Sequence, residues 1–144
     1  MESVFADTSA LFKFYYPEDG SEKVEASLIE AERVYVSQIA IIEFSSALMK
    51  KVRTRSLDTD SQVLIWNTFV DDLESGQMEL IPLDDRHYEK ATDIIRSYGE
   101  KKDIRTLDSL QLVAALDVPD AQFLTADKHL SALAVRMGFR VERV

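Results

Sequence analysis

The chain has 144 residues, of which 46% are hydrophobic and 30% charged, a composition typical of a soluble globular protein, and its length predicts one domain over residues 1–144. The formal net charge of −9 argues against a protein that coats nucleic acid through bulk electrostatics, and the absence of cysteine excludes disulfides, thiolate catalysis and cysteine-ligated zinc. No apolar run approaches the ~20 residues of a membrane helix, and the first residues lack the pattern of a signal peptide, so we expect a cytoplasmic protein without a membrane partner.

Short apolar strands alternate with amphipathic helices along the whole chain. In chain order we predict a strand at 3–6, a helix at 9–16, a helix at 18–32, a strand at 33–37, a helix from there to about 53, a helix from 57 or 58 to 75, a strand at 78–83, a helix at 84–98, a helix at 107–116, a strand at 121–125, a helix at 127–137 and a last strand at 140–144. Gly76 stands where a left-handed residue commonly ends a helix, and Gly138 separates the last helix from the last strand. This alternation predicts an α/β fold of three layers, α/β/α, in which helices flank a central, mainly parallel sheet.

Four acidic residues of this pattern have mainly apolar stretches beside them in the sequence: Asp7, Glu43, Asp108 and Asp127. The three aspartates lie where an apolar stretch meets the start of a helix, in SVFADTSALF, RTLDSLQLVAAL and FLTADKHLSAL. Glu43 lies inside the apolar helix QIAIIEFSSALM, where little of the helix surface is expected to be solvated. A carboxylate in such surroundings is costly to desolvate unless it finds a partner.

Fold logic allows these four carboxylates to converge. Ligand sites of open parallel sheets lie beyond the carboxyl ends of the strands, and Asp7 and Asp127 follow two predicted strands. Four carboxylates at one edge would repel one another, and a divalent cation would neutralise them. With no cysteine and only two histidines in the chain, the residues favour a cation held by oxygen, Mg²⁺ or Mn²⁺, over zinc or copper.

Each aspartate also has a purely structural interpretation. Asp7 and Asp127 are plausible helix caps, and Asp108, just after a possible Thr106 cap, would suit the helix dipole. His87 and His129 are expected to be ordinary surface or capping residues, with a minor substrate contact left open for His129.

Other chemistries lack their anchoring motifs. The chain has no GxxxxGK[ST] loop, no GxGxxG and no GxSxG elbow, which argues against nucleotide-binding and serine-hydrolase functions. A receiver-type phosphotransfer domain would need paired acids after the first strand, and DTSALF supplies one. A phosphatase of the haloacid-dehalogenase kind would need DxDxT, and Ser9 occupies its second acidic position.

Two short basic segments interrupt the acidic chain. One is KKVRTR at 50–55, and the other is KKDIR at 101–105. Each is either a solvated helix end, whose cations complement the helix dipole, or a local binding site for a polyanion.

The ordered set ADTSALF, VSQIAIIEFSSAL, RTLDSLQLVAAL and FLTADKHLSALAVRMGF resembles the PIN-domain ribonucleases, in particular the VapC-like toxins of type II toxin–antitoxin pairs, over essentially the whole chain. The resemblance implies a PIN-like fold with an acidic site made of Asp7, Glu43, Asp108 and Asp127. It implies Mg²⁺- or Mn²⁺-dependent hydrolysis of RNA phosphodiesters, in which Asp7 and Asp108 are the main metal ligands. Glu43 and Asp127 would complete the site or orient the attacking water.

The resemblance also implies supporting residues and partners. Hydrogen bonds from Thr8 or Ser9, and from Thr125, would support the acidic site. Single-stranded or structured RNA would be held by basic residues drawn from Arg53, Arg55, Lys102, Arg105 and Lys128. Similar toxins form homodimers and are silenced by a small antitoxin, whose arginine-bearing tail enters the acidic groove.

Lys128 and His129 follow Asp127 where some family members carry a further acid, a departure that bears on whether a second metal ion binds. Tyr15 and Tyr16 are expected to pack rather than to stack on bases. Two other functions stay open: a PIN nuclease of RNA maturation, which would use the same site, and a non-catalytic PIN-like binding or scaffold domain.

Overall fold

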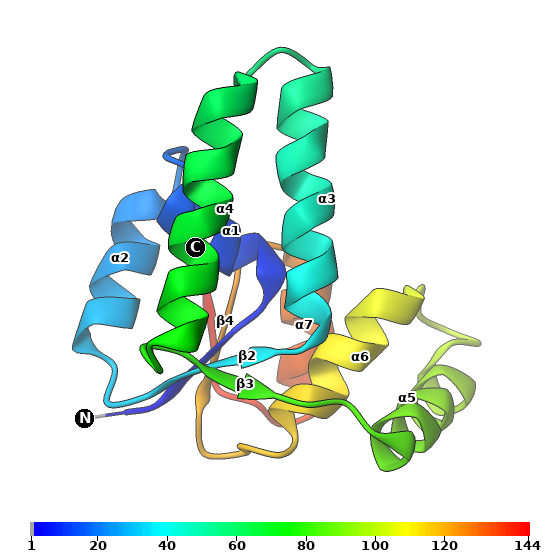
Figure 1. The fold of residues 1–144 in the computed structure, drawn as a ribbon. Coiled ribbons are helices and arrows are strands. Elements are labelled where there is room, and N and C mark those ends of the chain that lie inside the picture. Colours follow the sequence, from blue (N-terminus) through cyan, green and yellow to red (C-terminus); the bar gives the residue numbers. More distant parts are fainter. Residues whose placement is uncertain (1) are drawn as a thin grey trace.

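The computed structural model describes residues 2–144, which form one sheet surrounded by helices (Figure 1). The sheet has five strands, all parallel, in the order β3-β2-β1-β4-β5. The strands are β1 (Val4–Ala6), β2 (Val34–Ser37), β3 (Glu79–Ile81), β4 (Gln122–Thr125) and β5 (Val141–Arg143). The helices are α1 (Thr8–Tyr15), α2 (Ser21–Glu30), α3 (Ile39–Arg53), α4 (Thr59–Glu74), α5 (Asp85–Tyr98), α6 (Thr106–Ala115) and α7 (Lys128–Arg136). The predicted α/β class is confirmed, and the sheet is entirely parallel rather than mainly so.

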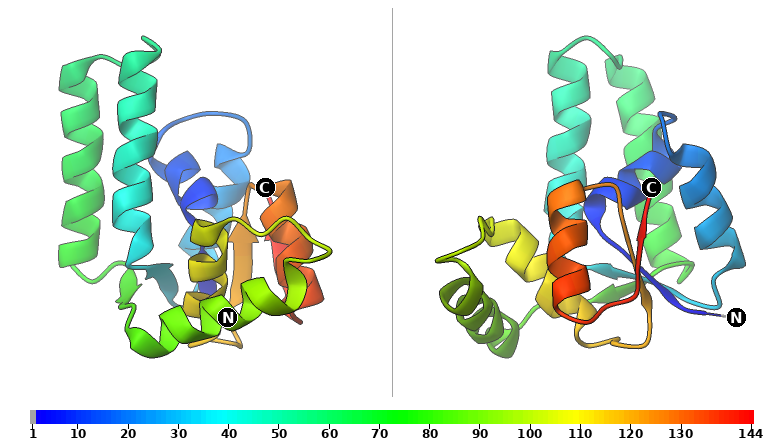
Figure 2. Two further views of the ribbon diagram at one scale, coloured as in Figure 1. Left: turned by 90° about the vertical axis from the view of Figure 1, so that its right-hand side faces the viewer. Right: turned by 180° about the vertical axis from the view of Figure 1, so that it is seen from behind.

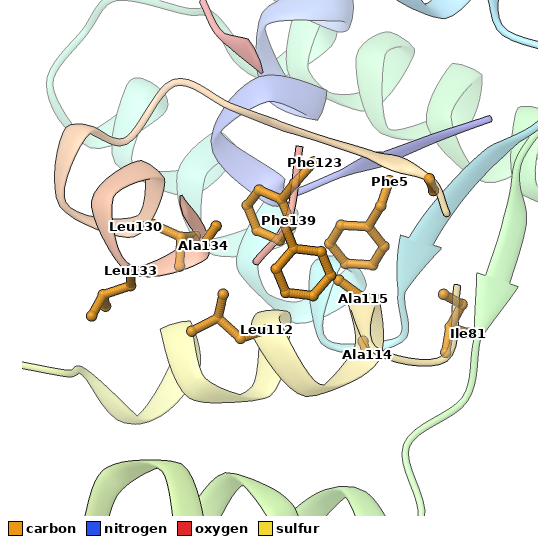
Figure 3. Packing of buried hydrophobic residues seen from close by; sticks show 11 residues of the cluster. Phe5, Ile81, Leu112, Ala114, Ala115, Phe123, Leu130, Leu133, Ala134 and Phe139 are labelled. Carbon is orange, nitrogen blue, oxygen red and sulfur yellow. The ribbon is translucent and has the colours of Figure 1, made fainter. Parts of the chain in front are cut away.

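Helices cover both faces of the sheet, because successive strand side chains point to opposite sides. On one face, Phe5 of β1 stacks on Phe123 of β4 with 5.3 Å between ring centroids. This pair packs with Leu112 of α6 and Leu130 of α7 in a buried cluster (Figure 3). Helix α5 packs on the outer side of α6.

On the opposite face, Ala6 of β1 and Val36 of β2 pack with buried residues of α1, α3 and α4. Helix α2 joins this face through Val24, which packs with Val4 and Leu124. The predicted three-layer α/β/α arrangement is therefore confirmed.

Helices α3 and α4 form an antiparallel hairpin that extends well beyond the sheet (Figures 1 and 2). Phe44 of α3 stacks on Phe69 of α4 at 4.2 Å, and both rings are fully buried. Tyr15 of α1 packs edge-on against these two rings and donates a hydrogen bond of 2.6 Å to Asp72 Oδ2. Tyr16 stacks on Phe12, so both tyrosines pack as expected.

The element boundaries follow the local signals with a few corrections. Gly76 and Gly138 have φ of +80° and +93°, the left-handed conformation that glycine adopts at low cost at helix ends. Helix α2 begins at Ser21 rather than 18, because Gly20 before it is also left-handed. Thr106 is the first residue of α6 and not its cap, since the capping position belongs to Arg105, which makes no side-chain capping bond.

The structure also corrects the end of one strand and the burial of one histidine. The strand predicted at 78–83 is shorter, since β3 ends at Ile81. His87 is a capping residue of α5, as expected, but it is buried rather than on the surface, and its Nε2 lies 2.7 Å from Asp117 Oδ2. None of the helices in the described part of the chain is long and apolar enough to cross a bilayer.

Candidate functional site

The four acidic residues lie together at the carboxyl edge of the sheet. Asp7 directly follows β1, Asp127 comes just after β4, Glu43 lies early in α3 behind β2, and Asp108 is in the first turn of α6. Burial raises the pKa of Asp7, Glu43 and Asp108, and in each case the charge of a neighbouring acid adds to it: Glu43 for Asp7, Asp108 for Glu43, and Asp127 for Asp108. Four elements thus contribute to one acidic site, as the strand-end argument predicted.

Asp7 is the most deeply buried of the four, with 3% of its surface exposed. As the cap of α1 its Oδ1 accepts a hydrogen bond of 2.9 Å from the Ala10 backbone N–H. Ser9 Oγ donates to both carboxylate oxygens, and Thr125 Oγ1 donates to Oδ2 at 2.6 Å. Burial raises the pKa of Asp7 to about 6, although these hydrogen bonds favour the charged form.

Ser9 and Thr125 also tie the ends of two neighbouring strands together. Ser9 Oγ accepts a hydrogen bond of 2.9 Å from Ala126 N, and Thr125 Oγ1 accepts one of 3.0 Å from Asp127 N. The same hydroxyls that hold Asp7 therefore fix the chain just before Asp127. The hydrogen-bonding support expected from Ser9 and Thr125 is present in this geometry.

Glu43 is held by a closed triangle of hydrogen bonds. Its Oε1 accepts bonds from Thr8 Oγ1 at 2.9 Å and from Gln111 Nε2 at 2.7 Å, and Gln111 Nε2 also donates to Thr8 Oγ1. Burial is the main cause that raises the pKa of Glu43, and the two donors oppose it. Within residues 2–144 no hydrogen bond reaches Oε2, so one oxygen of Glu43 is fixed and the other is available.

One sequence expectation about this region is wrong, and one residue of the site lies outside the predicted set. Glu43 does not sit on an evenly buried helix, because the adjacent Ile42 is 69% exposed while Phe44 is buried. Gln111 is not among the predicted site residues, although it is 2% exposed and completes the triangle. The available signal was its spacing, since Gln111 is a lone amide in the apolar run LQLVAA, one helical turn beyond Asp108.

Asp108 and Asp127 share a single arginine. Arg105 Nη2 donates a hydrogen bond of 3.0 Å to Asp127 Oδ2, and its Nε lies 3.3 Å from Asp108 Oδ2 in an ion pair that lacks hydrogen-bond geometry. Asp108 Oδ2 is buried and has no hydrogen-bond partner in the described part of the chain. Burial raises the pKa of Asp108, and the Arg105 charge opposes this. Asp127 also caps α7 through the N–H groups of His129 and Leu130.

The donor chemistry of this site fits a hard divalent cation. Four neighbouring carboxyl groups, among them an oxygen of Asp108 that accepts no hydrogen bond in the described chain and an available oxygen of Glu43, offer the oxygen ligands that Mg²⁺ and Mn²⁺ prefer. Over residues 2–144, no three acidic or histidine side chains already stand in positions to hold a metal ion. Binding would therefore need side-chain adjustment, and Arg105 is the cation that now neutralises Asp108 and Asp127.

A groove of about 760 Å³ opens from the site between α1 and α3. Thr8, Ser9 and Glu43 line its acidic end, and Lys13, Lys50 and Arg53 line it further along. Of the basic residues proposed to hold RNA, Arg53 and Arg105 line this groove. Arg55, Lys102 and Lys128 are exposed elsewhere, and the sequence did not single out Lys13.

A parallel α/β/α fold with acidic side chains at its carboxyl edge defines the class of this protein. Residues 4–136 match the family model of the PIN domain, and the chain belongs to this family, which confirms the resemblance read from the sequence motifs. No match was found among the curated proteins.

Solved structures share the fold over almost their full length. VapC20 from Mycobacterium tuberculosis, a sarcin-ricin loop cleaving toxin, is 14% identical, with a TM-score of 0.73 over 98% of this chain and 99% of that one. FitAcB from Neisseria gonorrhoeae is 21% identical, with a TM-score of 0.65 over 96% and 95%. VapBC2 from Rickettsia felis, bound to a promoter DNA fragment, is 13% identical, with a TM-score of 0.67 over 98% of each chain.

Proposed function

We propose that this protein is an endoribonuclease, dependent on Mg²⁺ or Mn²⁺, that hydrolyses phosphodiester bonds of single-stranded RNA as the toxin of a toxin–antitoxin pair. The observation that carries the proposal is the row of four coupled carboxyl groups at the carboxyl edge of a PIN-domain sheet. A scaffold domain would have no reason to keep four carboxylates together at one edge of the sheet, three of them at least partly buried. The toxin role is supported by the similarity in fold to VapC and FitAB structures.

In this proposal Asp7 and Asp108 hold the metal ion. A divalent cation held there would polarise the phosphate and lower the pKa of a water molecule. Glu43 receives the proton of the attacking water on Oε2, because its Oε1 is fixed by Thr8 and Gln111. The water oxygen bonds to phosphorus as the bond to the leaving oxygen breaks, and the leaving oxygen takes a proton from solvent.

Asp127 and Arg105 complete the site in the proposal. Asp127 joins the ligands or orients water at the start of α7, where it is already held as a cap. Arg105 is 61% exposed, so its guanidinium can turn from the two aspartates to a phosphate of the substrate. Ser9 and Thr125 keep Asp7 in place through their hydroxyls.

The test is cleavage of a broad pool of transcripts by wild type, Asp7→Asn and Asp108→Asn, each with Mg²⁺ or Mn²⁺ and with a chelator. We expect cleavage by wild type only with metal, and a loss of about 100-fold or more in each variant, as is typical when a preorganised electrostatic contact is removed. Asp93→Asn on the exposed surface of α5 makes the same charge change and should cleave normally. Persistent cleavage by both folded variants would show that Asp7 and Asp108 do not form the catalytic site.

The partners are proposed on the same basis. The chain is expected to form a homodimer in the cytoplasm and to be silenced by a small antitoxin, which sedimentation and co-purification with the product of a neighbouring reading frame would test. A wild type that cleaves RNA but has no such partner would instead be a PIN nuclease of RNA maturation. A wild type that neither binds metal nor cleaves RNA would be a scaffold.

A further inference from the structure

We propose that the RNA strand is held on one side of the scissile phosphate only, in the groove between α1 and α3, where Lys50 and Arg53 bind its phosphates. This inference rests on the proposed function and adds the path and the polarity of substrate binding. It also separates the basic residues of the chain into those that contact substrate and those that do not.

The groove follows one face of α3. Glu43, Ser46, Lys50 and Arg53 all line it and recur at intervals of three or four residues, the spacing that aligns side chains on one side of a helix. The rise of about 1.5 Å per residue places Arg53 roughly 15 Å along the helix from Glu43. Helix α3 extends away from the sheet together with α4 (Figure 1). The groove residues of α3 from Glu43 to Arg53 therefore lead outward from the carboxylates.

Charges are arranged along this groove from acidic to basic. Lys50 and Arg53 form no ion pair within residues 2–144, so their charges are available to an outside anion. Lys13 is different, because its Nζ is held by Glu18 at 3.2 Å and by the Asp19 carbonyl at 2.6 Å.

Glu18, which lines the same groove away from the site carboxylates, does not cancel this attraction. Glu18 is neutralised by Lys13 at 3.2 Å and by Lys51 at 3.7 Å, and Lys51 also lies over the ring of Tyr16. Lys51 therefore serves the packing between α1 and α3. In a chain of net charge −9, a polyanion is attracted only where such local positive charge is left over.

The acidic end of the groove offers a different surface. Ile42 and Leu107, each next to a site carboxylate in the sequence, line the groove and are 69% and 45% exposed. Exposed aliphatic side chains at this place suit contact with unstacked bases, which only a single strand presents. We therefore assign phosphate contacts to the outer part of the groove and base contacts to the part beside the carboxylates.

The first test measures binding separately from cleavage. Fluorescence anisotropy of a fluorescein-labelled oligouridylate, with Asp7→Asn in every protein to prevent turnover, compares the double charge reversal Lys50→Glu/Arg53→Glu with the unaltered groove over a range of salt. We expect affinity to fall about tenfold or more, and the slope of log K against log salt to shrink by about 1.4, since each contact to a single strand contributes about 0.7. The matched control is Arg55→Glu/Lys102→Glu, which makes the same charge change on exposed residues outside the groove and should change neither quantity by more than the general charge effect.

The second test asks on which side of the cut, 5′ or 3′, the wild-type protein contacts the RNA. An RNA that it cleaves is shortened stepwise from the 5′ side and from the 3′ side of the cut, and kcat/KM is measured for each product. We expect losses from one side only, and the double charge reversal should abolish the difference. Equal losses from both sides, or equal effects of the two double reversals in binding, would overturn the inference while cleavage by wild type still upheld the proposed function. Absence of cleavage by wild type would reject the proposed function, and the binding test would still decide between the two sets of basic residues.

Discussion

At the scale of single residues, the four carboxyl groups have unequal surroundings. Asp7 is almost fully enclosed and receives hydrogen bonds from Ser9, Ala10 and Thr125, whereas Asp127 keeps 27% of its side chain exposed. Glu43 has one oxygen fixed and one available, and Asp108 has a buried oxygen without a hydrogen bond in the described chain. These differences give each residue its own testable behaviour.

The raised pKa of Asp7 predicts how the metal-free protein responds to pH. The folded state keeps the proton up to about pH 6, while the unfolded chain loses it near 3.8. Because the folded state binds more protons in this interval, the free energy of unfolding falls as pH rises from about 3.8 to 6. Above pH 6 the contribution of Asp7 stays at this lower value. Asp7→Asn should remove this fall and stabilise the metal-free protein by about 1–3 kcal/mol at pH 7. Urea unfolding of both proteins with a chelator, from pH 4 to 7, measures it; parallel pH dependence of the two would refute the prediction.

Arg105 is predicted to compete with a divalent cation for Asp108 and Asp127. Removing its charge in Arg105→Gln should tighten Mn²⁺ binding about three- to tenfold, as expected from a partly exposed ion pair worth about 1 kcal/mol. Titration calorimetry of the metal alone measures this. Lys102→Gln in the same loop is the control, because it loses the same charge at an exposed position without a site contact. Unchanged or weaker Mn²⁺ binding in Arg105→Gln would argue against this competition.

At the scale of elements, the position of Glu43 depends on how α3 packs. Phe44 is fully buried against Phe69, Phe12 and Tyr15, and this anchor turns the preceding residue toward Thr8 and Gln111. Ile42, on the other side of Glu43, faces the groove.

Neighbouring apolar residues of α3 should therefore differ sharply in mutational cost. Phe44→Ala should lower the free energy of unfolding by about 3–5 kcal/mol, the usual range for a buried ring. Ile42→Ala should change it by less than about 0.5 kcal/mol, since the side chain is mostly exposed. Denaturant unfolding of the two variants provides the comparison, and similar losses in both would show that the helix face is assigned wrongly.

At the scale of the whole molecule, the projecting α3–α4 hairpin raises the question of whether it unfolds with the sheet. Buried residues of the hairpin, such as Phe44 and Phe69, belong to the same cluster as Ala6 of β1 and Val36 of β2. The sheet itself joins both ends of the described chain, since β1 and β5 both pair with β4. We therefore predict one cooperative domain.

The single tryptophan makes this prediction testable. Trp66 lies on α4 and packs near Phe44 and Phe69, so its fluorescence reports on the hairpin, while far-UV circular dichroism reports on all elements. The two urea transitions should coincide in midpoint and slope. A fluorescence transition at lower urea would mean that the hairpin is a separate folding unit.

The amino-acid sequence alone predicted the elements of this fold and most of the acidic site. Strand and helix periodicity, the glycines at 76 and 138 and the capping positions of Asp7 and Asp127 are local features, and local backbone physics acts on them directly. Because all strands of a parallel sheet end at the same edge, acids that follow a strand lie at that edge whatever the strand order.

Only the tertiary structure decided the strand order and the direction of helical side chains. The closed triangle of Glu43, Thr8 and Gln111 joins three helices, and the placement of Arg105 between Asp108 and Asp127 joins a loop to two helix starts. The same holds for the basic residues, of which Arg53 lines the groove and Arg55 does not. The physical reason is that a helix fixes only the relative angles of its side chains, and the packing of buried rings such as Phe44 sets which way that whole pattern faces.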